Sequence, residues 1–308
     1  MIYTLFLGNL HRKIILVICY SYQYFIMSII YRITASIFLL LTTIPFVNGQ
    51  IFEHPKQQLI NADSLRAEYD KAPYFGLYKD NYFIFGTSLN HKPSKENTNV
   101  KFQVSIQQKL TKSTLPGGTY LYLYYTQKVF WNVLEESLPM KDLNFNPGIG
   151  IAKPLFHKGR YIGKFSFQIE HESNGRDSIQ SRSWNKISFG GNILLENNWL
   201  IHAKFGIPIV DGENNKDLLK YKGIFQIGTQ FMTNDNRWKF GLLLVKRKDW
   251  KPNFNIIGEI KYRFSRKADW SIFLQYYNGY GEDLLNYKMF KSQLRAGIVI
   301  TPPMFSDY

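Results

Sequence analysis

The chain has 308 residues, of which 45% are hydrophobic and 17% aromatic, and it carries a formal charge of +15. This length suits one large barrel or two ordinary domains, and the aromatic content is high for a soluble protein. The basic residues are spread along the chain, so the charge suits an anionic lipid surface as well as nucleic acid, and we expect no nucleic-acid partner. The sequence contains no zinc-ligand cluster, phosphate-binding glycine loop or dinucleotide fingerprint, which sets those classes aside.

The N-terminal residues 1–49 form a separate region, because they contain no acidic and only three basic residues. A short basic segment begins at Met27, an apolar stretch follows at 35–47, and small residues precede Gln50. This order predicts a targeting region at 1–49, with a signal peptide that starts at Met27. A membrane helix at 14–31 is the alternative, but polar residues interrupt that stretch. The only cysteine of the chain lies in this region, so its removal permits, but does not establish, an oxidising compartment.

After residue 50, period-two alternation recurs to the end of the chain without any long helical periodicity. We therefore expect an all-β protein, a 12-stranded antiparallel transmembrane β-barrel at 82–308, preceded by a periplasmic segment at 50–81. Most expected strands have the ten or eleven residues that a tilted membrane-spanning strand needs, and their number is even. The expected strands are 82–88, 101–110, 121–131, 145–155, 163–173, 183–196, 199–209, 222–233, 237–247, 254–264, 270–281 and 292–300.

The connections between these strands alternate in length. They are mostly long after odd-numbered strands and short after even ones, as in barrels with long loops outside and short turns at the periplasmic end, and only 111–120 departs from this trend. A soluble sandwich or a water-filled barrel would alternate in the same way, but aromatic residues near strand ends favour membrane-interface girdles. These aromatic residues include Tyr120, Tyr122, Tyr124, Tyr125, Phe130, Trp131, Trp184, Trp199, Trp238, Trp270, Tyr276 and Tyr277.

The fifth and sixth expected strands carry polar residues on the apolar face. In the fifth, His171 and Ser173 share a face with phenylalanine and isoleucine, while lysine, glutamine and glutamate occupy the other face. In the sixth, Asn185 lies on the apolar face in the same way. Pairing Ser173 with Ser183 sets His171 opposite Asn185 and matches every apolar pair, and a slip by one residue would turn the set inward.

These three residue types suit nucleophilic catalysis. A serine hydroxyl becomes nucleophilic when an imidazole takes its proton, and a third group fixes the imidazole's tautomer and orientation. Ser173, His171 and Asn185 are therefore the candidate nucleophile, base and orienting residue. A neutral Asn185 also costs less beside hydrocarbon than a carboxylate would. Polar residues near a strand end can equally be interfacial groups without catalytic function, and spacing alone leaves both interpretations open.

The run His171-x-Ser173-Asn174-Gly175-Arg176, followed by Ser181-Arg182-Ser183-Trp184-Asn185, resembles the signature of the outer-membrane phospholipase A family. The resemblance covers most of residues 74–308. Other segments that agree with it are Tyr78, Asn81-Tyr82, Tyr125-Thr-Gln-Lys128 with Trp131, Glu136-Ser-Leu-Pro139, and Gln275-Tyr-Tyr-Asn-Gly-Tyr-Gly-Glu282. It implies a calcium-dependent phospholipase A1/A2 in the outer membrane that acts on membrane phospholipids, with Ser173, His171 and Asn185 as the catalytic residues.

The resemblance also implies a calcium site and a homodimer. Ca²⁺ would be held by the backbone carbonyl of Arg176, the hydroxyl of Ser181 and, across the dimer interface, the hydroxyl of Ser137, and oxygen ligands suit this cation. Gln127 is either the family's interface glutamine or a residue that faces the lumen. The chain departs from the family pattern at Leu138, Met140 and Lys141.

The alternative function is a non-catalytic outer-membrane pore or transport barrel. A pore predicts a polar, water-filled lumen and gives His171 and Ser173 no reason to face lipid. Twelve strands make a narrow barrel that side chains readily fill. A different barrel enzyme of the lipid face, such as a deacylase or an acyltransferase, fits the strand count and the serine-rich segment after Gly175 less well.

Overall fold

A computed structural model describes residues 70–71, 75–158, 160–195, 198–209, 214–249, 251–265 and 268–302. All of them belong to one compact unit, Leu59–Tyr308. The expected signal peptide and most of the expected periplasmic segment lie outside the described residues. Among the residues that are described, no helix is long and apolar enough to cross a membrane.

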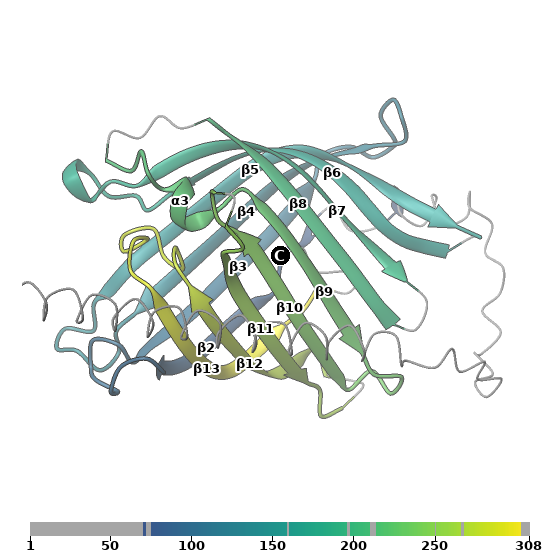
Figure 1. Ribbon diagram of the computed structural model, residues 1–308. Coiled ribbons are helices and arrows are strands. Elements are labelled where there is room, and N and C mark those ends of the chain that lie inside the picture. The colour runs from purple at the N-terminus through teal and green to yellow at the C-terminus, as the bar shows by residue number, and fades with distance from the viewer. Residues whose placement is uncertain are drawn as a thin grey trace, which may run out of the picture. The chain divides into compact units, whose positions relative to one another are not determined.

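Twelve strands form one closed antiparallel sheet, as the sequence predicted (Figure 1). Each strand pairs with its neighbours in the chain, and closure comes from the pairing of β13 with β2. The strands are β2 (Asn81–Ser88), β3 (Asn99–Lys109), β4 (Tyr120–Trp131), β5 (Met140–His157), β6 (Arg160–Ser173), β7 (Ser183–Leu195), β8 (Trp199–Ile209), β9 (Phe225–Met232), β10 (Trp238–Lys246), β11 (Phe254–Tyr262), β12 (Trp270–Gly279) and β13 (Lys291–Ile300).

The strand boundaries lie within three residues of the expected ones except at the start of β5, and one short strand was not expected. β5 begins at Met140 rather than 145, so the preceding connection is only 132–139. A short strand, β1 (Phe75–Leu77), pairs with β3 beyond the end of β2, so part of the segment expected before the barrel extends its sheet. Between β1 and β2 the chain turns inward, and the Tyr78 hydroxyl donates a hydrogen bond of 3.1 Å to Gln168 of β6.

Each strand separates an apolar outer face from a polar inner face. On β6, Phe165 and Ile169 are each 51% exposed, whereas Gln168 and Glu170, the neighbours of Ile169 in the chain, are buried in the lumen. The other strands follow the same alternation, which gives the barrel an exposed belt of large apolar side chains. Such a belt is stable only where lipid, rather than water, surrounds the barrel.

The expected aromatic girdle is confirmed for some of the residues and not for others. Trp199, Trp238 and Trp270 are exposed on the outer surface, and each begins the strand that follows a turn at the end opposite the long loops. The expectation is wrong for Tyr120, Tyr122, Tyr124, Phe130, Trp184 and Tyr277, which are buried. Their strand parity turns them inward, where the tyrosines of β4 pack together with Tyr78.

The long connections fold over one mouth of the barrel. The connection between β8 and β9 contains the short helix α3 (Leu219–Lys222), which lies beside the connection between β12 and β13 (Figure 1). Leu218 and Leu284 from these two connections are fully buried against Trp184. The side chain of Asn255 on β11 also donates to the Tyr221 carbonyl at 2.7 Å, which ties α3 to the wall of the barrel.

Ion pairs hold the interior together. Glu282, in the connection between β12 and β13, lies 2.6 Å from Arg295 and 3.1 Å from Lys101, and all three side chains are almost fully buried. Burial alone raises the pKa of the Glu282 carboxyl, but the charges of Arg295 and Lys101 outweigh it and hold that pKa below its ordinary value. The group is therefore ionised and stabilising at neutral pH.

Replacing this carboxylate should destabilise the barrel. Glu282→Gln leaves Arg295 and Lys101 buried without a counter-charge, and we expect the free energy of unfolding to fall by about 3 kcal/mol at pH 7. Because the folded pKa is depressed, the difference from the parent protein should stay constant above the ordinary carboxyl value of 4.5 and shrink as the pH falls below it. Denaturant unfolding from lipid vesicles measures both effects. Equal stability of Glu282→Gln and the parent protein at pH 7 would contradict a stabilising role of the Glu282 ion pairs.

Candidate active site on the outer face of β6 and β7

The register of β6 and β7 matches the predicted one at every position. Ser173 lies opposite Ser183, and His171 lies opposite Asn185. Ile169 and Phe167 face Ile187 and Phe189 in the same way, and the two phenylalanine rings are 5.1 Å apart. His171, Ser173 and Asn185 thus lie on the outer, lipid-facing side of the sheet, beside the long loops.

A hydrogen bond joins the candidate base to its candidate orienting residue. Nδ1 of His171 and Oδ1 of Asn185 are 2.8 Å apart. An amide oxygen only accepts, so Nδ1 of His171 is the donor in this contact. Among the described residues, no hydrogen bond joins the Ser173 hydroxyl to the imidazole, and Ser173 shares only the strand and the face of His171.

A residue on β5, Asn146, supports the backbone of His171, and the sequence reasoning did not identify it. β5 and β6 pair at Phe145–Ser173 and again at Gly148–Glu170. Between these pairs Pro147 has no N–H to donate. The Asn146 side chain instead donates a hydrogen bond of 2.8 Å to the His171 carbonyl. The asparagine before the proline is the only sequence signal for this contact.

Asn174 organises the loop that follows Ser173, and it too was missed as a functional residue. Its side-chain amide donates to the Gln180 carbonyl at 2.9 Å, and its side-chain oxygen accepts from the N–H of Arg182 at 3.0 Å. Gly175 has a φ of +63°, and a Cβ there would meet the ring of Phe145 at 2.8 Å. The loop therefore has a single tight path from β6 to β7.

The candidate calcium ligands Arg176 and Ser181 lie in this same loop. The guanidinium of Arg176 donates to the Gln180 side chain at 2.6 Å and to the Lys141 carbonyl at 2.5 Å. Within the described ranges, no three His, Cys, Asp or Glu side chains are grouped so as to hold a metal. The donors at this place are carbonyl and hydroxyl oxygens, which fit a hard cation such as Ca²⁺ and do not fit zinc.

Ser137 lies in the neighbouring loop, between β4 and β5. Ser137 and Leu138 have φ values of 63° and 47°, and the indole of Trp131 donates to the Leu138 carbonyl at 2.9 Å. The Arg176 contact to Lys141, at the start of β5, joins the two loops within one chain. Gln127 lies on the outer face of β4, together with Leu123 and Tyr125, and so does not face the lumen. The Tyr125 hydroxyl donates a hydrogen bond of 3.2 Å to the side-chain oxygen of Gln127.

Comparison with known proteins places the chain in a family. A family model described as Phospholipase A1 matches residues 66–300. The chain is 26% identical over 239 residues to Phospholipase A1 of Escherichia coli K12, which covers 72% of the chain and 80% of that protein. It is 27% identical over 239 residues to Phospholipase A1 of Proteus vulgaris, with the same coverage.

Solved structures show the same fold. Outer membrane phospholipase A from Escherichia coli superposes with a TM-score of 0.66 at 23% identity, covering 75% of this chain and 99% of that one. An outer membrane phospholipase dimer from Salmonella typhi with bound calcium gives a TM-score of 0.64 at 24% identity, covering 73% and 91%. The chain therefore belongs to the phospholipase A1 family of outer-membrane β-barrels.

Proposed function

We propose that this protein hydrolyses acyl ester bonds of membrane phospholipids, as a calcium-dependent phospholipase A1/A2 of the outer membrane. The observation that carries the proposal is the 2.8 Å hydrogen bond between His171 and Asn185 on the lipid-facing surface of a phospholipase A1 family barrel. Placing an oriented imidazole beside hydrocarbon costs free energy, and a base that accepts the proton of the Ser173 hydroxyl has a function that explains this cost.

His171 is the base and the acid of the proposed reaction. Rotation of the Ser173 side chain about χ1 brings its hydroxyl toward Nε2, which takes the proton as Oγ attacks the ester carbonyl. Collapse of the tetrahedral intermediate breaks the ester C–O bond, and the same proton passes to the departing lysophospholipid. A water molecule then attacks the acyl-serine and gives a proton to Nε2. This proton passes to Oγ of Ser173 as the acyl C–O bond breaks, which releases the fatty acid and restores the hydroxyl. Asn185 keeps Nδ1 protonated throughout.

The loop after Ser173 would hold the cation. The Arg176 carbonyl and the Ser181 hydroxyl are the proposed ligands from one chain, and Ser137 from a second copy would add a third. Bound Ca²⁺ would polarise the ester carbonyl and stabilise the oxyanion. Asn174 contributes by fixing the loop from inside through hydrogen bonds to the loop backbone.

A homodimer is part of the proposal. The Salmonella relative is described as a dimer with bound calcium. In this chain, Gln127 projects from the apolar outer face of β4, where a polar side chain is stabilised by a partner across an interface. Two such faces would also bring Ser137 of one protomer to the calcium loop of the other, so activity would depend on association.

The pore alternative receives no support from the interior. The described part of the lumen holds a cavity of about 220 Å³, and lysine–carboxylate pairs and buried tyrosines fill the space around it. The buried leucines of the long connections close the mouth above it. A transport barrel also gives no role to the His171–Asn185 contact.

Ser173→Ala should abolish hydrolysis. The test uses protein that begins at residue 50, refolded in detergent and assayed with calcium. We expect a loss of roughly 1000-fold or more, because the nucleophile is gone. Asn185→Ala should cost about 100-fold, because the imidazole remains but loses its orientation. Release of fatty acid from a diacyl phospholipid gives the rates. Ser183→Ala, directly opposite on β7, is the matched control and should keep full activity, whereas an active Ser173→Ala would exclude the proposed nucleophile.

Asn174→Ala should raise the calcium requirement. The loop that carries Arg176 and Ser181 loses its internal hydrogen bonds, and we expect the half-maximal calcium concentration to rise about tenfold, as for other residues that orient metal ligands. The matched control is Asn90→Ala. Asn90 lies in a different long loop, and its side-chain oxygen accepts a hydrogen bond from the backbone N–H of Ser292 on β13. A calcium titration of activity that is unchanged in Asn174→Ala would show that this loop does not hold the cation.

A further inference from the structure

Glu172 lies between the two proposed reacting residues on β6. His171 and Ser173 point outward, so Glu172 points into the lumen, where it lines the cavity. Its position in the chain makes it the inward anchor of the short stretch of backbone that carries both reacting side chains.

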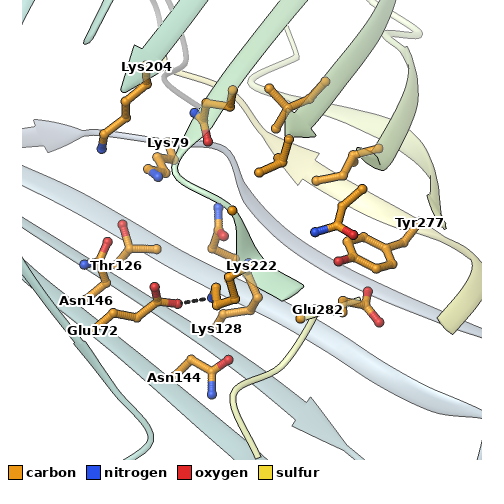
Figure 2. A pocket seen from close by; sticks show the side chains of 18 of the residues that line it. Lys79, Thr126, Lys128, Asn144, Asn146, Glu172, Lys204, Lys222, Tyr277 and Glu282 are labelled. Carbon is orange, nitrogen blue, oxygen red and sulfur yellow. Dashed lines mark hydrogen bonds and ion pairs between the residues drawn. The ribbon is translucent and has the colours of Figure 1, made fainter. Parts of the chain in front are cut away.

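Both carboxylate oxygens of Glu172 are engaged. Nζ of Lys222 lies 2.5 Å from Oε1, and Nε1 of Trp184 donates to Oε2 at 2.8 Å (Figure 2 shows the contact between Glu172 and Lys222). Trp184 lies directly opposite Glu172 on β7, so that contact joins neighbouring strands. Lys222 is distant in sequence and belongs to α3, so the ion pair joins the sheet to a long connection.

Lys222 is held firmly at its own end. Its N–H donates to the Leu218 carbonyl at 2.9 Å, and Leu218 is fully buried. Its stem packs on Gly281, where an added Cβ would meet Cγ of Lys222 at 2.8 Å. Lys222, the ion-pair partner of Glu172, is therefore held in place by the loops that close the barrel mouth.

The sheet itself supports this part of β6 weakly. In the described part of the sheet, the register gives Glu172 and His171 no partner on β5 between the Phe145–Ser173 and Gly148–Glu170 pairs, and Pro147 supplies no N–H there. On the β5 side, the Asn146 side chain donates a hydrogen bond to the His171 carbonyl at this break in the pairing. Contacts from inside the barrel therefore matter more for the position of this backbone than they would where all β5–β6 pairs are formed.

We propose that the ion pair between Glu172 and Lys222 positions His171 and Ser173 from inside the barrel, and that it couples the β8–β9 connection to the reaction. This inference rests on the proposed function. The two residues never meet the substrate, because the lumen and the lipid-facing site lie on opposite sides of the sheet. They act through the backbone, where displacement of a reacting group by about 1 Å costs up to roughly 100-fold in rate.

The test compares Glu172→Gln, Lys222→Met and Lys222→Arg with the parent protein in phospholipid hydrolysis. We expect kcat to fall about tenfold or more in the first two variants with KM nearly unchanged, because the substrate surface is intact and only the reacting geometry is disturbed. Lys222→Arg keeps the charge and should restore most of kcat. Only folded protein is counted, by its migration on gels before and after heating.

Glu259→Gln is the matched control, since Glu259 is a buried luminal carboxylate that accepts from Gln275 and pairs with Lys261, two residues further along β11. It should lower stability without lowering kcat. If Glu259→Gln lowers kcat as much as Lys222→Met, or if folded Lys222→Met keeps the parent kcat, the positioning role is wrong while the proposed function stands. An inactive parent protein, by contrast, would overturn the proposed function itself.

Discussion

The alternation of side chains along each strand is the constraint on which this structure depends. In a closed sheet every second residue faces a narrow interior, and the others face outward. The inner set is polar and must be neutralised there, as Glu282 is by Arg295 and Lys101. The outer set is apolar, and the few polar residues in it stand out as His171, Ser173 and Asn185 do.

The two faces are not independent, because they share a backbone. Glu172 inside and His171 outside are neighbours on β6, and the hydrogen bond from Asn146 reaches the His171 backbone from β5. The luminal network therefore has two functions in this account. It stabilises the polar interior of the barrel, and it fixes the backbone on which the proposed chemistry takes place.

The sequence predicted the features that depend on pattern. The twelve strands and the pairing of His171 with Asn185 follow from period-two alternation, since only one register keeps the apolar residues together. The luminal tyrosines of β4 were misassigned because aromatic residues suit both an interface and a packed interior. Asn146, Asn174 and Lys222 were missed because they act on backbone or on residues far away in the chain, and no local pattern marks such contacts.

Covalent labelling of the folded protein tests the central claim most directly. A serine-reactive fluorophosphonate with a long alkyl chain, added to the protein in detergent micelles with calcium, should modify Ser173 alone among the serines, and peptide mass spectrometry locates the label. His171→Ala should suppress the labelling, because the hydroxyl loses its base. Labelling spread over several serines, or equal labelling of Ser173 without His171, would contradict an activated nucleophile on the lipid-facing surface.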